Sequence, residues 1–471
     1  MQSVRNNVPQ LTAFLNEVPK GGDLHYHLSG GVYAESMIGW AADAKLCVVT
    51  ATLQLVQPPC NEGAGNVEAQ SAFNDPLLYR RIIDAWSMRD WAYSGQSGHD
   101  HFFDTFGKFG PADDDRTGEM LAEVAQRAAD NHELYQELMF TADDGRVASV
   151  GKQVGWIEDF KTMRETLLAN GLIDGVDAGR KNIDAAEKKR DSDLQCGSEK
   201  PHTGCKITQR YIYQVLRGLP KQIVFAQILA GFEMATRDPR VVGFNLVMPE
   251  DTYVPMHDYR LHMRIIDFLK PLYPKVHIAL HAGELAPGSV PPEGLSFHIR
   301  AAVETGHAER IGHGIDVMEE ENAIDLLKEM AKRDVMVEIN LTSNDVILGV
   351  KGKDHPLASY MKYGVPVALS TDDEGVSRSD MSMEYLRGVT DQNLSYSQLK
   401  NMARTSLEHA FIDGQSLWRD DHKFLRVKEC ATDRVSSAKS SASCDAYLHA
   451  NAKANLQWVL ERQFAEFESR W

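Results

Sequence analysis

Residues 221–247, KQIVFAQILAGFEMATRDPRVVGFNLV, combine an amphipathic helix with the strand that follows it. The apolar residues of the first part recur at i, i+3, i+4 and i+7, the spacing of one helical face: Phe225, Ile228, Leu229 and Phe232. Asp238-Pro239 predicts the end of a helix over 221–237, because proline disfavours helical backbone in the residue before it. The apolar run 240–247 then predicts a strand. A helix followed directly by a strand is the repeating unit of α/β folds with a parallel sheet.

The same alternation extends along the chain and predicts eight strands. We expect them at 23–28, 134–141, 207–217, 240–247, 276–281, 310–313, 335–341 and 365–371. Strands alternating with helices indicate an α/β fold with a parallel sheet, and eight of them favour a closed (β/α)8 TIM barrel. An open doubly wound sheet is the alternative, but no glycine-rich phosphate-binding turn follows the first strand.

Three segments interrupt this alternation. Residues 40–75 predict a loop-rich insertion, and residues 146–206 predict a second one that begins as a helix and ends in a polar run. The apolar face of that helix consists of Trp156, Phe160, Met163 and Leu167. We therefore expect a barrel domain over 1–390 that carries both insertions, and a helical C-terminal extension over 391–471, broken by a serine-rich loop and packed on the barrel.

Composition narrows the class of partner. The chain has 471 residues, 43% of them apolar, and its 50 basic and 67 acidic residues give a net charge of −17. Such a surface repels phosphate backbones and anionic lipids, so nucleic acid and membrane partners are disfavoured. No run of eighteen uncharged apolar residues is present to span a bilayer. We expect a small-molecule partner, and the composition leaves a homodimer open.

Six cysteines fall into three local couples: Cys47 with Cys60, Cys196 with Cys205, and Cys430 with Cys444. None of the couples has the Cys-x-x-Cys spacing of a zinc or redox site. We predict three disulfides rather than six free thiols, and hence a periplasmic or secreted protein. Because residues 1–7 lack the apolar core of a signal peptide, we expect that such a peptide has been removed.

Reactive side chains follow four of the predicted strands. His25 and His27 are two residues apart in the first predicted strand, so their side chains point to the same side. The reactive residues at the other three strands are His281 with Glu284, His313, and Asp372 with Asp373. The C-terminal ends of barrel strands meet at one rim, so these side chains should converge. Three histidines and one carboxylate suit a catalytic zinc, one Zn2+ per chain, with Glu284 free to act as acid or base. A structural zinc site is the alternative.

These motifs resemble those of the adenosine/AMP deaminase superfamily, specifically the adenosine deaminases, including their secreted growth-factor-like branch. The resemblance covers residues 23–30, 132–144, 207–251 and 275–385. Its motifs are His-Ala-Gly-Glu at 281–284, Gly-His-Gly at 312–314, Thr-Ser-Asn at 342–344 with His355-Pro356, and Ser-Thr-Asp-Asp at 370–373. It implies a β/α barrel hydrolase that converts adenosine to inosine and ammonia, with 2′-deoxyadenosine as a further substrate.

The resemblance also implies residue roles. Zinc would be held by His25, His27, His281 and Asp372. Glu284 would protonate N1 of the purine, His313 would orient the hydroxide that attacks C6, and Asp373 would hydrogen-bond N7. Further substrate contacts are implied at Ser29, at the Met248 amide, and in an apolar lid of Phe102, Phe103 and Phe106.

Departures from the family pattern concern the sugar. Ser29 stands where the family usually has a longer acidic or amide residue that meets the ribose, and Met248 stands where it usually has a glycine near N3. Residues 374–377, Glu-Gly-Val-Ser, replace a Pro-Gly-Val-Phe that is frequent in the family. We expect that these departures leave the zinc chemistry unchanged and weaken the binding of the substrate's ribose.

Rival interpretations concern substrate and class. Adenine, AMP or an N6-substituted adenosine could replace adenosine, although few basic residues lie near the motifs to bind a phosphate: Lys351, Lys353 and Arg378. A binuclear amidohydrolase is disfavoured because strand four ends at Asn245–Met248 without a lysine. A secreted binding or signalling protein, acting through its cysteine-closed insertions, is compatible with deaminase activity.

Overall fold

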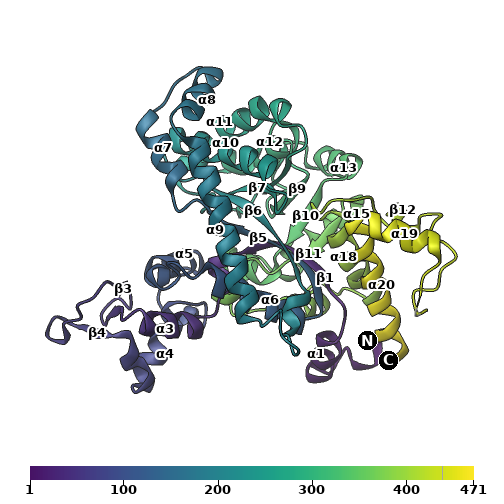
Figure 1. The fold of residues 1–471 in the computed structure, drawn as a ribbon, viewed down its shortest axis with the longest axis horizontal. Helices are drawn as coiled ribbons and strands as arrows, with labels where there is room; N and C mark the ends of the chain where they lie inside the picture. Colours follow the sequence, from purple (N-terminus) through teal and green to yellow (C-terminus); the bar gives the residue numbers. More distant parts are fainter. Residues whose placement is uncertain (438, 471) are drawn as a thin grey trace.

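The computed structural model describes residues 1–437 and 439–470, and its centre is a barrel of eight parallel strands (Figure 1). The strands are β1 (Gly21–His27), β5 (Glu133–Phe140), β6 (Thr208–Leu216), β7 (Val241–Val247), β8 (His277–Ala282), β9 (Arg310–His313), β10 (Met336–Ile339) and β11 (Val367–Leu369). They pair side by side in chain order, and each occupies one of the eight predicted runs. The predicted α/β fold, a (β/α)8 TIM barrel, is confirmed.

The barrel closes between its first and last strands. Tyr26 of β1 forms a parallel bridge with Asp372, three residues beyond the end of β11. The Asp372 N–H donates to the carbonyl of His25 over 2.9 Å, and the His27 N–H donates to the carbonyl of Asp372 over 3.2 Å. We call this junction the seam. It brings the first and last of the sequence motifs together.

Helix α10 (Lys221–Arg237) begins and ends at the predicted residues. It is buried on all sides, because its inner face covers the sheet while α7 (Arg146–Val154) packs on its outer face. Phe232 meets Phe244 of β7 at a ring-centroid distance of 4.8 Å. The second insertion therefore acts as an additional layer over the barrel helices.

That insertion is more helical than expected. It contains α7, α8 (Phe160–Ala169) and the long α9 (Leu172–Asp193), which occupies most of the predicted polar run. The buried residues of α9 recur every three or four positions along an otherwise charged helix: Leu172, Gly175, Val176, Gly179, Ile183 and Ala186. This sparse stripe packs against α6 (Thr117–Asp130) and α10. Trp156 lies before α8, in a loop, and meets Phe225 of α10.

The first insertion is not only loops. It carries a small antiparallel sheet of β2 (Cys47–Val49), β3 (Leu55–Val56) and β4 (Asn66–Glu68), ordered β3-β2-β4. In Figure 1 this sheet lies beside α3 (Ala34–Asp43) and α4 (Pro76–Ala85), to the side of the barrel. A disulfide joins Cys47 to Cys60 within it.

All three predicted disulfides are present, and the described residues include no free cysteine. The last one, Cys430–Cys444, lies in the C-terminal extension beside Trp418 and Trp458. This region consists of α18 (Tyr396–Glu408), the β12 (Trp418–Asp420) and β13 (Leu425–Arg426) pair, α19 (Ala442–Ala450) and α20 (Ala452–Arg470). Phe464 and Phe467 of α20 join the barrel core. Separate domains over 1–390 and 391–471 stay a prediction.

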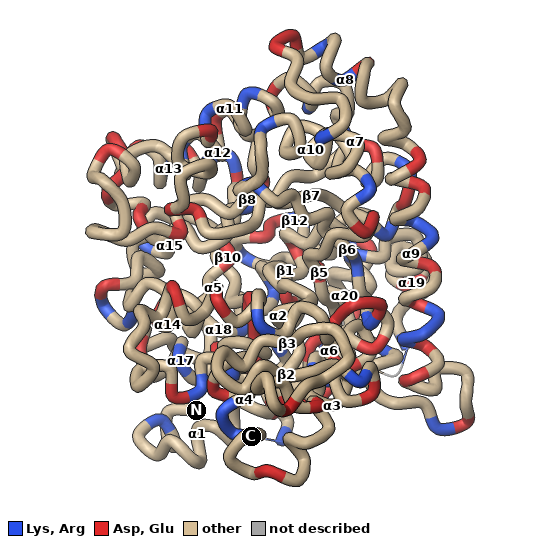
Figure 2. Tube along the Cα trace, turned by 90° about the vertical axis from the view of Figure 1, so that its left-hand side faces the viewer, with Lys and Arg blue, Asp and Glu red and all other residues tan. Residues whose placement is uncertain are grey.

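The surface carries both signs of charge. Figure 2 shows Lys and Arg positions interspersed with Asp and Glu positions along the outer helices and loops. Among the described residues, no helix combines the length and the apolar character that crossing a bilayer would require.

Candidate metal centre and active site

The motif side chains converge at the C-terminal rim of the barrel. His25 and His27 come from β1, His281 from β8, and Asp372 from the turn after β11. One side-chain donor atom of each lies within 4.8 Å of the corresponding atoms of the other three. His27 Nε2 is 3.2 Å from His281 Nε2 and 3.5 Å from Asp372 Oδ1. These are the four residues that the resemblance implied as zinc ligands.

The chemistry of this group fits a zinc ion. His25 Nε2 is buried and has no hydrogen-bond partner among the described residues, although it is only 3.5 Å from Asp372 Oδ1. Burial lowers the pKa of His27 to about 4 and that of His281 well below its usual range, so both rings are neutral. At His25 burial is outweighed by the neighbouring Asp372 and Glu338 carboxylates, which raise the pKa to about 10, so a metal ion at His25 Nε2 would displace a proton. Neutral imidazoles and one carboxylate are ligands that Zn2+ prefers in catalytic sites.

The other ring nitrogen of His25 and of His281 is held in place by a buried polar side chain. Glu338 Oε2 lies 2.6 Å from His25 Nδ1, and Asn245 Oδ1 lies 2.9 Å from His281 Nδ1. Such contacts orient imidazoles toward a metal. Neither Glu338 nor Asn245 was singled out from the sequence. The available signal was a polar residue inside an otherwise apolar strand, since Glu338 lies in β10 and Asn245 lies in β7.

Glu284 lies in the loop after β8, with its carboxyl group directed toward the same space. Its Oε1 is 3.7 Å from His313 Nε2. Burial and the neighbouring Asp372 carboxylate raise the pKa of Glu284 to about 8. The carboxyl group is therefore protonated at neutral pH and can act as an acid.

A buried carboxylate that sequence reasoning missed holds the backbone of this loop. Glu250 accepts the Glu284 N–H over 2.9 Å and the Gly283 N–H over 3.2 Å. It also pairs with His298 Nδ1 at 2.6 Å and faces Arg217 at 3.9 Å. His298, which fitted no motif, thus lies outside the pocket but supports the residue that holds Glu284 in place.

Asp373 is buried beside Asp372. Burial and the Asp372 carboxylate raise the pKa of Asp373 well above its usual range. Its Oδ1 has no hydrogen-bond partner among the described residues. A Cβ at Gly30 would overlap this carboxyl group, which explains a glycine at the end of His-Leu-Ser-Gly. A protonated carboxyl group with one oxygen free of partners is suited to donate to an acceptor on a ligand.

A cavity of about 430 Å³ opens above this group. The predicted site residues Ser29, Met248, Phe102, Phe103 and Phe106 all line it. The three phenylalanines belong to α5 (Gly98–Phe109), which forms the apolar wall, and Phe102 also packs in the core. Met248 has φ +87°, a left-handed backbone conformation that favours glycine. The position is therefore one where the backbone would suit a glycine.

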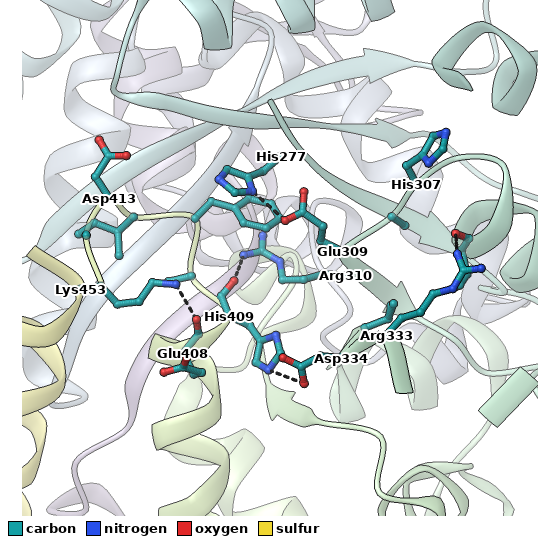
Figure 3. A pocket seen from close by; sticks show the side chains of 17 residues that line it. His277, His307, Glu309, Arg310, Arg333, Asp334, Glu408, His409, Asp413 and Lys453 are labelled. Atoms are coloured by element: carbon teal, nitrogen blue, oxygen red, sulfur yellow. Dashed lines mark hydrogen bonds and ion pairs between the residues drawn. The ribbon is translucent and has the colours of Figure 1, made fainter. Parts of the chain in front are cut away.

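A larger hollow of about 610 Å³ lies at the opposite end of the barrel (Figure 3). Most of its charged groups contact one another, the backbone or buried carboxylates. His277 Nδ1 is 2.8 Å from Glu309, Lys453 Nζ donates to the Glu408 carbonyl over 2.7 Å, and Arg310 reaches inward to Glu137 and Glu338. No predicted catalytic residue lines it, so the smaller cavity is the candidate active site.

Comparisons with known proteins agree with this choice. The family model described as adenosine deaminase matches residues 170–418, more than half of the chain. An adenine deaminase from Sinorhizobium fredii is 26% identical over 295 residues, which span 62% of this chain and 73% of that protein. An adenosine deaminase from Salmonella schwarzengrund is 36% identical over 156 residues, 33% of this chain and 42% of that protein.

A solved structure extends the likeness of fold. An amidohydrolase from Burkholderia ambifaria, with bound Zn, has a TM-score of 0.55 at 16% identity and covers 88% of this chain and 89% of its own. The range matched by the family model includes Glu284, His313 and the Asp372-Asp373 pair. The chain belongs to the adenosine deaminase family, within the superfamily of adenosine and adenine deaminases.

Proposed function

We propose that this protein hydrolyses adenosine, and 2′-deoxyadenosine, to the corresponding inosine and ammonia, with one Zn2+ per chain. The observation that carries the proposal is the buried Glu284 carboxyl group, with its pKa raised to about 8, in a pocket that members of the group of three histidines and Asp372 also line. A purine C6 amine becomes a leaving group only after the ring accepts a proton and water adds to C6. The proximity of Glu284 to the group of three histidines and Asp372 supports the proposal, because an acid and a metal-activated water would then act on the same purine ring.

His25, His27, His281 and Asp372 would hold the zinc ion. When bound, zinc polarises a water molecule and makes it nucleophilic near neutral pH. Glu284 donates its proton to N1, which makes C6 more electrophilic. Asp373, with its pKa raised and its Oδ1 free of partners among the described residues, donates a hydrogen bond to N7, an acceptor. His313 stabilises the oxygen that adds to C6.

The proposed reaction balances without a further reactant. One water adds its oxygen to C6 and the C6–N bond breaks. Of the two protons of water, one leaves with the amino group as ammonia, and the other restores on Glu284 the proton that was given to N1 and stays on the product. Phe102, Phe103 and Phe106 cover the apolar face of the base and keep bulk water from the reacting carbon.

The pocket favours an uncharged substrate. No lysine or arginine is among the described residues that line it. A nucleotide phosphate normally needs such cations or several backbone N–H groups. We therefore propose a nucleoside or free base rather than AMP.

Adenine is the second candidate. Ser29 lines the pocket with a short hydroxyl, and the family resemblance implies a ribose contact at this position. The relatives include an adenine deaminase, matched over 62% of this chain. A weak sugar contact is compatible with two kinds of enzyme. One binds adenosine weakly, and the other acts on the free base and needs no sugar contact.

A parallel assay separates these substrates. Adenosine, 2′-deoxyadenosine, adenine and AMP are incubated with the protein, and the loss of absorbance of the aminopurine is followed for each. Turnover of adenosine and 2′-deoxyadenosine is expected to exceed that of adenine and AMP. Turnover of adenine alone would replace the proposal by its second candidate, and activity that survives thorough chelation would contradict the zinc requirement.

Ser29 gives a finer test of the sugar contact. Losing one hydrogen bond to a charged group costs roughly 1.5–3 kcal/mol, or about one to two orders of magnitude in affinity. We expect a high KM for adenosine and little discrimination against 5′-deoxyadenosine, and Ser29→Asp should restore that discrimination. An unchanged rate ratio in Ser29→Asp would show that Ser29 does not meet the ribose.

We also propose that the protein works in the periplasm or outside the cell. Its three disulfides support this location, because such bonds persist in oxidising compartments. A fractionation experiment that finds the protein only in the cytoplasm, with reduced cysteines, would contradict it.

A further inference from the structure

Two sequence motifs, Thr-Ser-Asn at 342–344 and His355-Pro356, have no place in the mechanism above. Asn344 lies in α14 (Leu341–Leu348), and His355 lies just before α15 (Leu357–Tyr363). Both side chains are buried, and neither is among the described residues that line the pocket. They form a hydrogen-bonded row that runs from the Leu357 backbone through His355 and Asn344 to His313.

The first member of the row fixes the proton of His355. The Leu357 N–H lies 3.1 Å from His355 Nδ1, and a backbone N–H can only donate. His355 Nδ1 therefore presents a lone pair, and the proton of the neutral ring is on Nε2. Burial lowers the pKa of His355 to about 4, so the ring is neutral at ordinary pH.

The proton of His355 then orients the Asn344 amide. His355 Nε2–H points to Asn344 Oδ1 at 3.2 Å, so the amide oxygen is the acceptor. The amide NH2 must face the other way, and Asn344 Nδ2 lies 3.0 Å from His313 Nδ1. Asn340 Nδ2 approaches the same ring nitrogen at 3.3 Å. An amide NH2 only donates, so His313 Nδ1 is an acceptor.

The last step defines the catalytic histidine. With a lone pair on Nδ1, neutral His313 carries its proton on Nε2. This atom is buried and has no hydrogen-bond partner among the described residues, with Glu284 Oε1 and Asp372 Oδ2 each 3.7 Å away.

We propose that His355 and Asn344 are positioning residues that hold His313 as the neutral Nε2–H tautomer. His313 then donates a hydrogen bond to the oxygen that adds to C6 and cannot accept a proton from it. The catalytic part of this inference rests on the proposed function, whereas the tautomer does not. The proton that water loses must go to a carboxylate, either Asp372 or Glu284 after it has protonated N1.

The tautomer also separates two overlapping groups of potential metal ligands. Glu284, His313 and Asp372 form a second set of donor atoms within 4.8 Å of one another. A ring nitrogen that carries a proton has no lone pair to coordinate a metal. The fixed tautomer therefore excludes His313 as a ligand and leaves the group of three histidines and Asp372.

The direct test is the 15N spectrum of histidine-labelled protein, with the His313 signals assigned by comparison with His313→Gln. The wild-type protein should show a protonated Nε2 and an unprotonated Nδ1 for His313. Asn344→Asp replaces the donor by an acceptor of nearly the same shape and should place a proton on Nδ1. A wild-type ring with its proton on Nδ1, or no change at Nδ1 in Asn344→Asp, would overturn the proposal.

Kinetics test the relay one residue further back, on whichever aminopurine the wild-type protein deaminates. His355→Leu removes the donor that orients Asn344 and should lower kcat about 10- to 100-fold with little change in KM and in zinc content. His355→Gln keeps an amide donor near Nε2 and should recover most of that loss. A glutamine variant no better than the leucine variant would refute the relay.

His262→Leu is the matched control. His262 is a buried histidine of α11 (Tyr253–Leu269) whose ring nitrogens have no hydrogen-bond partner among the described residues. Its replacement should leave the His313 signals and kcat unchanged. Since the spectra require no substrate, an error in the proposed substrate would appear in the activity assays and leave the tautomer result standing.

Discussion

Glu250→Gln should show how strongly the active-site loop depends on one buried carboxylate. Glu250 is 2% exposed and binds the backbone of Gly283 and Glu284, the His298 ring and the Arg217 guanidinium. Glutamine has one acceptor oxygen, so its NH2 group would face a donor. Arg217, which also donates to the carbonyl groups of Met248 and His281, would lose its counter-charge.

The expected loss follows from these contacts. Burial alone would raise the pKa of Glu250, but Arg217 and His298 hold it from its usual 4.5 down to about 2. That difference corresponds to about 3 kcal/mol, at roughly 1.4 kcal/mol per pKa unit. Leaving one partner of a buried ion pair without the other costs about 3–5 kcal/mol. We expect the free energy of unfolding to fall by about 3–4 kcal/mol.

Urea denaturation at pH 7 measures this loss, with the exposed Glu321→Gln as the control. The Glu250→Gln variant should also lower kcat, because the Glu284 backbone loses its acceptor. A carboxylate with a depressed pKa stabilises the fold above pH 4.5, and this contribution is lost as pH falls toward 2. The difference between the variant and the wild type should shrink accordingly. A loss below about 1 kcal/mol at pH 7 with unchanged kcat would refute this account of Glu250.

Three further outcomes are expected. Glu284→Gln should lower kcat by about 100- to 10,000-fold while zinc, measured by elemental analysis, stays bound; loss of the metal would instead make Glu284 a ligand. Replacing Cys196 and Cys205 by serine should lower the free energy of unfolding by about 3 kcal/mol, and an unchanged urea midpoint would contradict this. His99 of α5 bonds to Asp251, in the loop after β7, over 3.2 Å, and this hydrogen bond raises the pKa of His99 to about 9. The ion pair between them is therefore complete below pH 6.5 and is lost as pH rises through 9. KM should therefore rise above pH 9 in the wild type but not in His99→Gln.

The sequence predicted the barrel well because its strands are short apolar runs that are buried on both faces. The run 310–313 coincides with β9, and helix 221–237 coincides with α10. Helix α9 was missed because its apolar stripe is sparse and flanked by many charges, so that its composition suggests a polar loop. The small sheet of the first insertion was missed because its strands have only two or three residues.

The site was predictable only in part, for a related reason. His281, His313 and Asp372 each follow an apolar run, and the barrel rule alone brings such positions to one rim. Glu250, Glu338 and Asn344 act through partners that are distant in sequence, and a single sequence contains no record of such pairs. Their roles became visible only when the carboxyl and amide groups could be assigned to particular donors and acceptors. The catalytic roles of the rim residues themselves stay predictions.

The seam at Tyr26 and Asp372 makes the proposed zinc site depend on closure of the barrel, because it joins the proposed ligands of the first strand to Asp372. His25 and His27 are among the first barrel residues to be synthesised, whereas Asp372 is among the last. A chain that ends before β11, or whose last strand has not docked, lacks the carboxylate and the full donor set. Tight zinc binding would then be a property of the closed ring alone, and by mass action the metal would favour closure over any open intermediate.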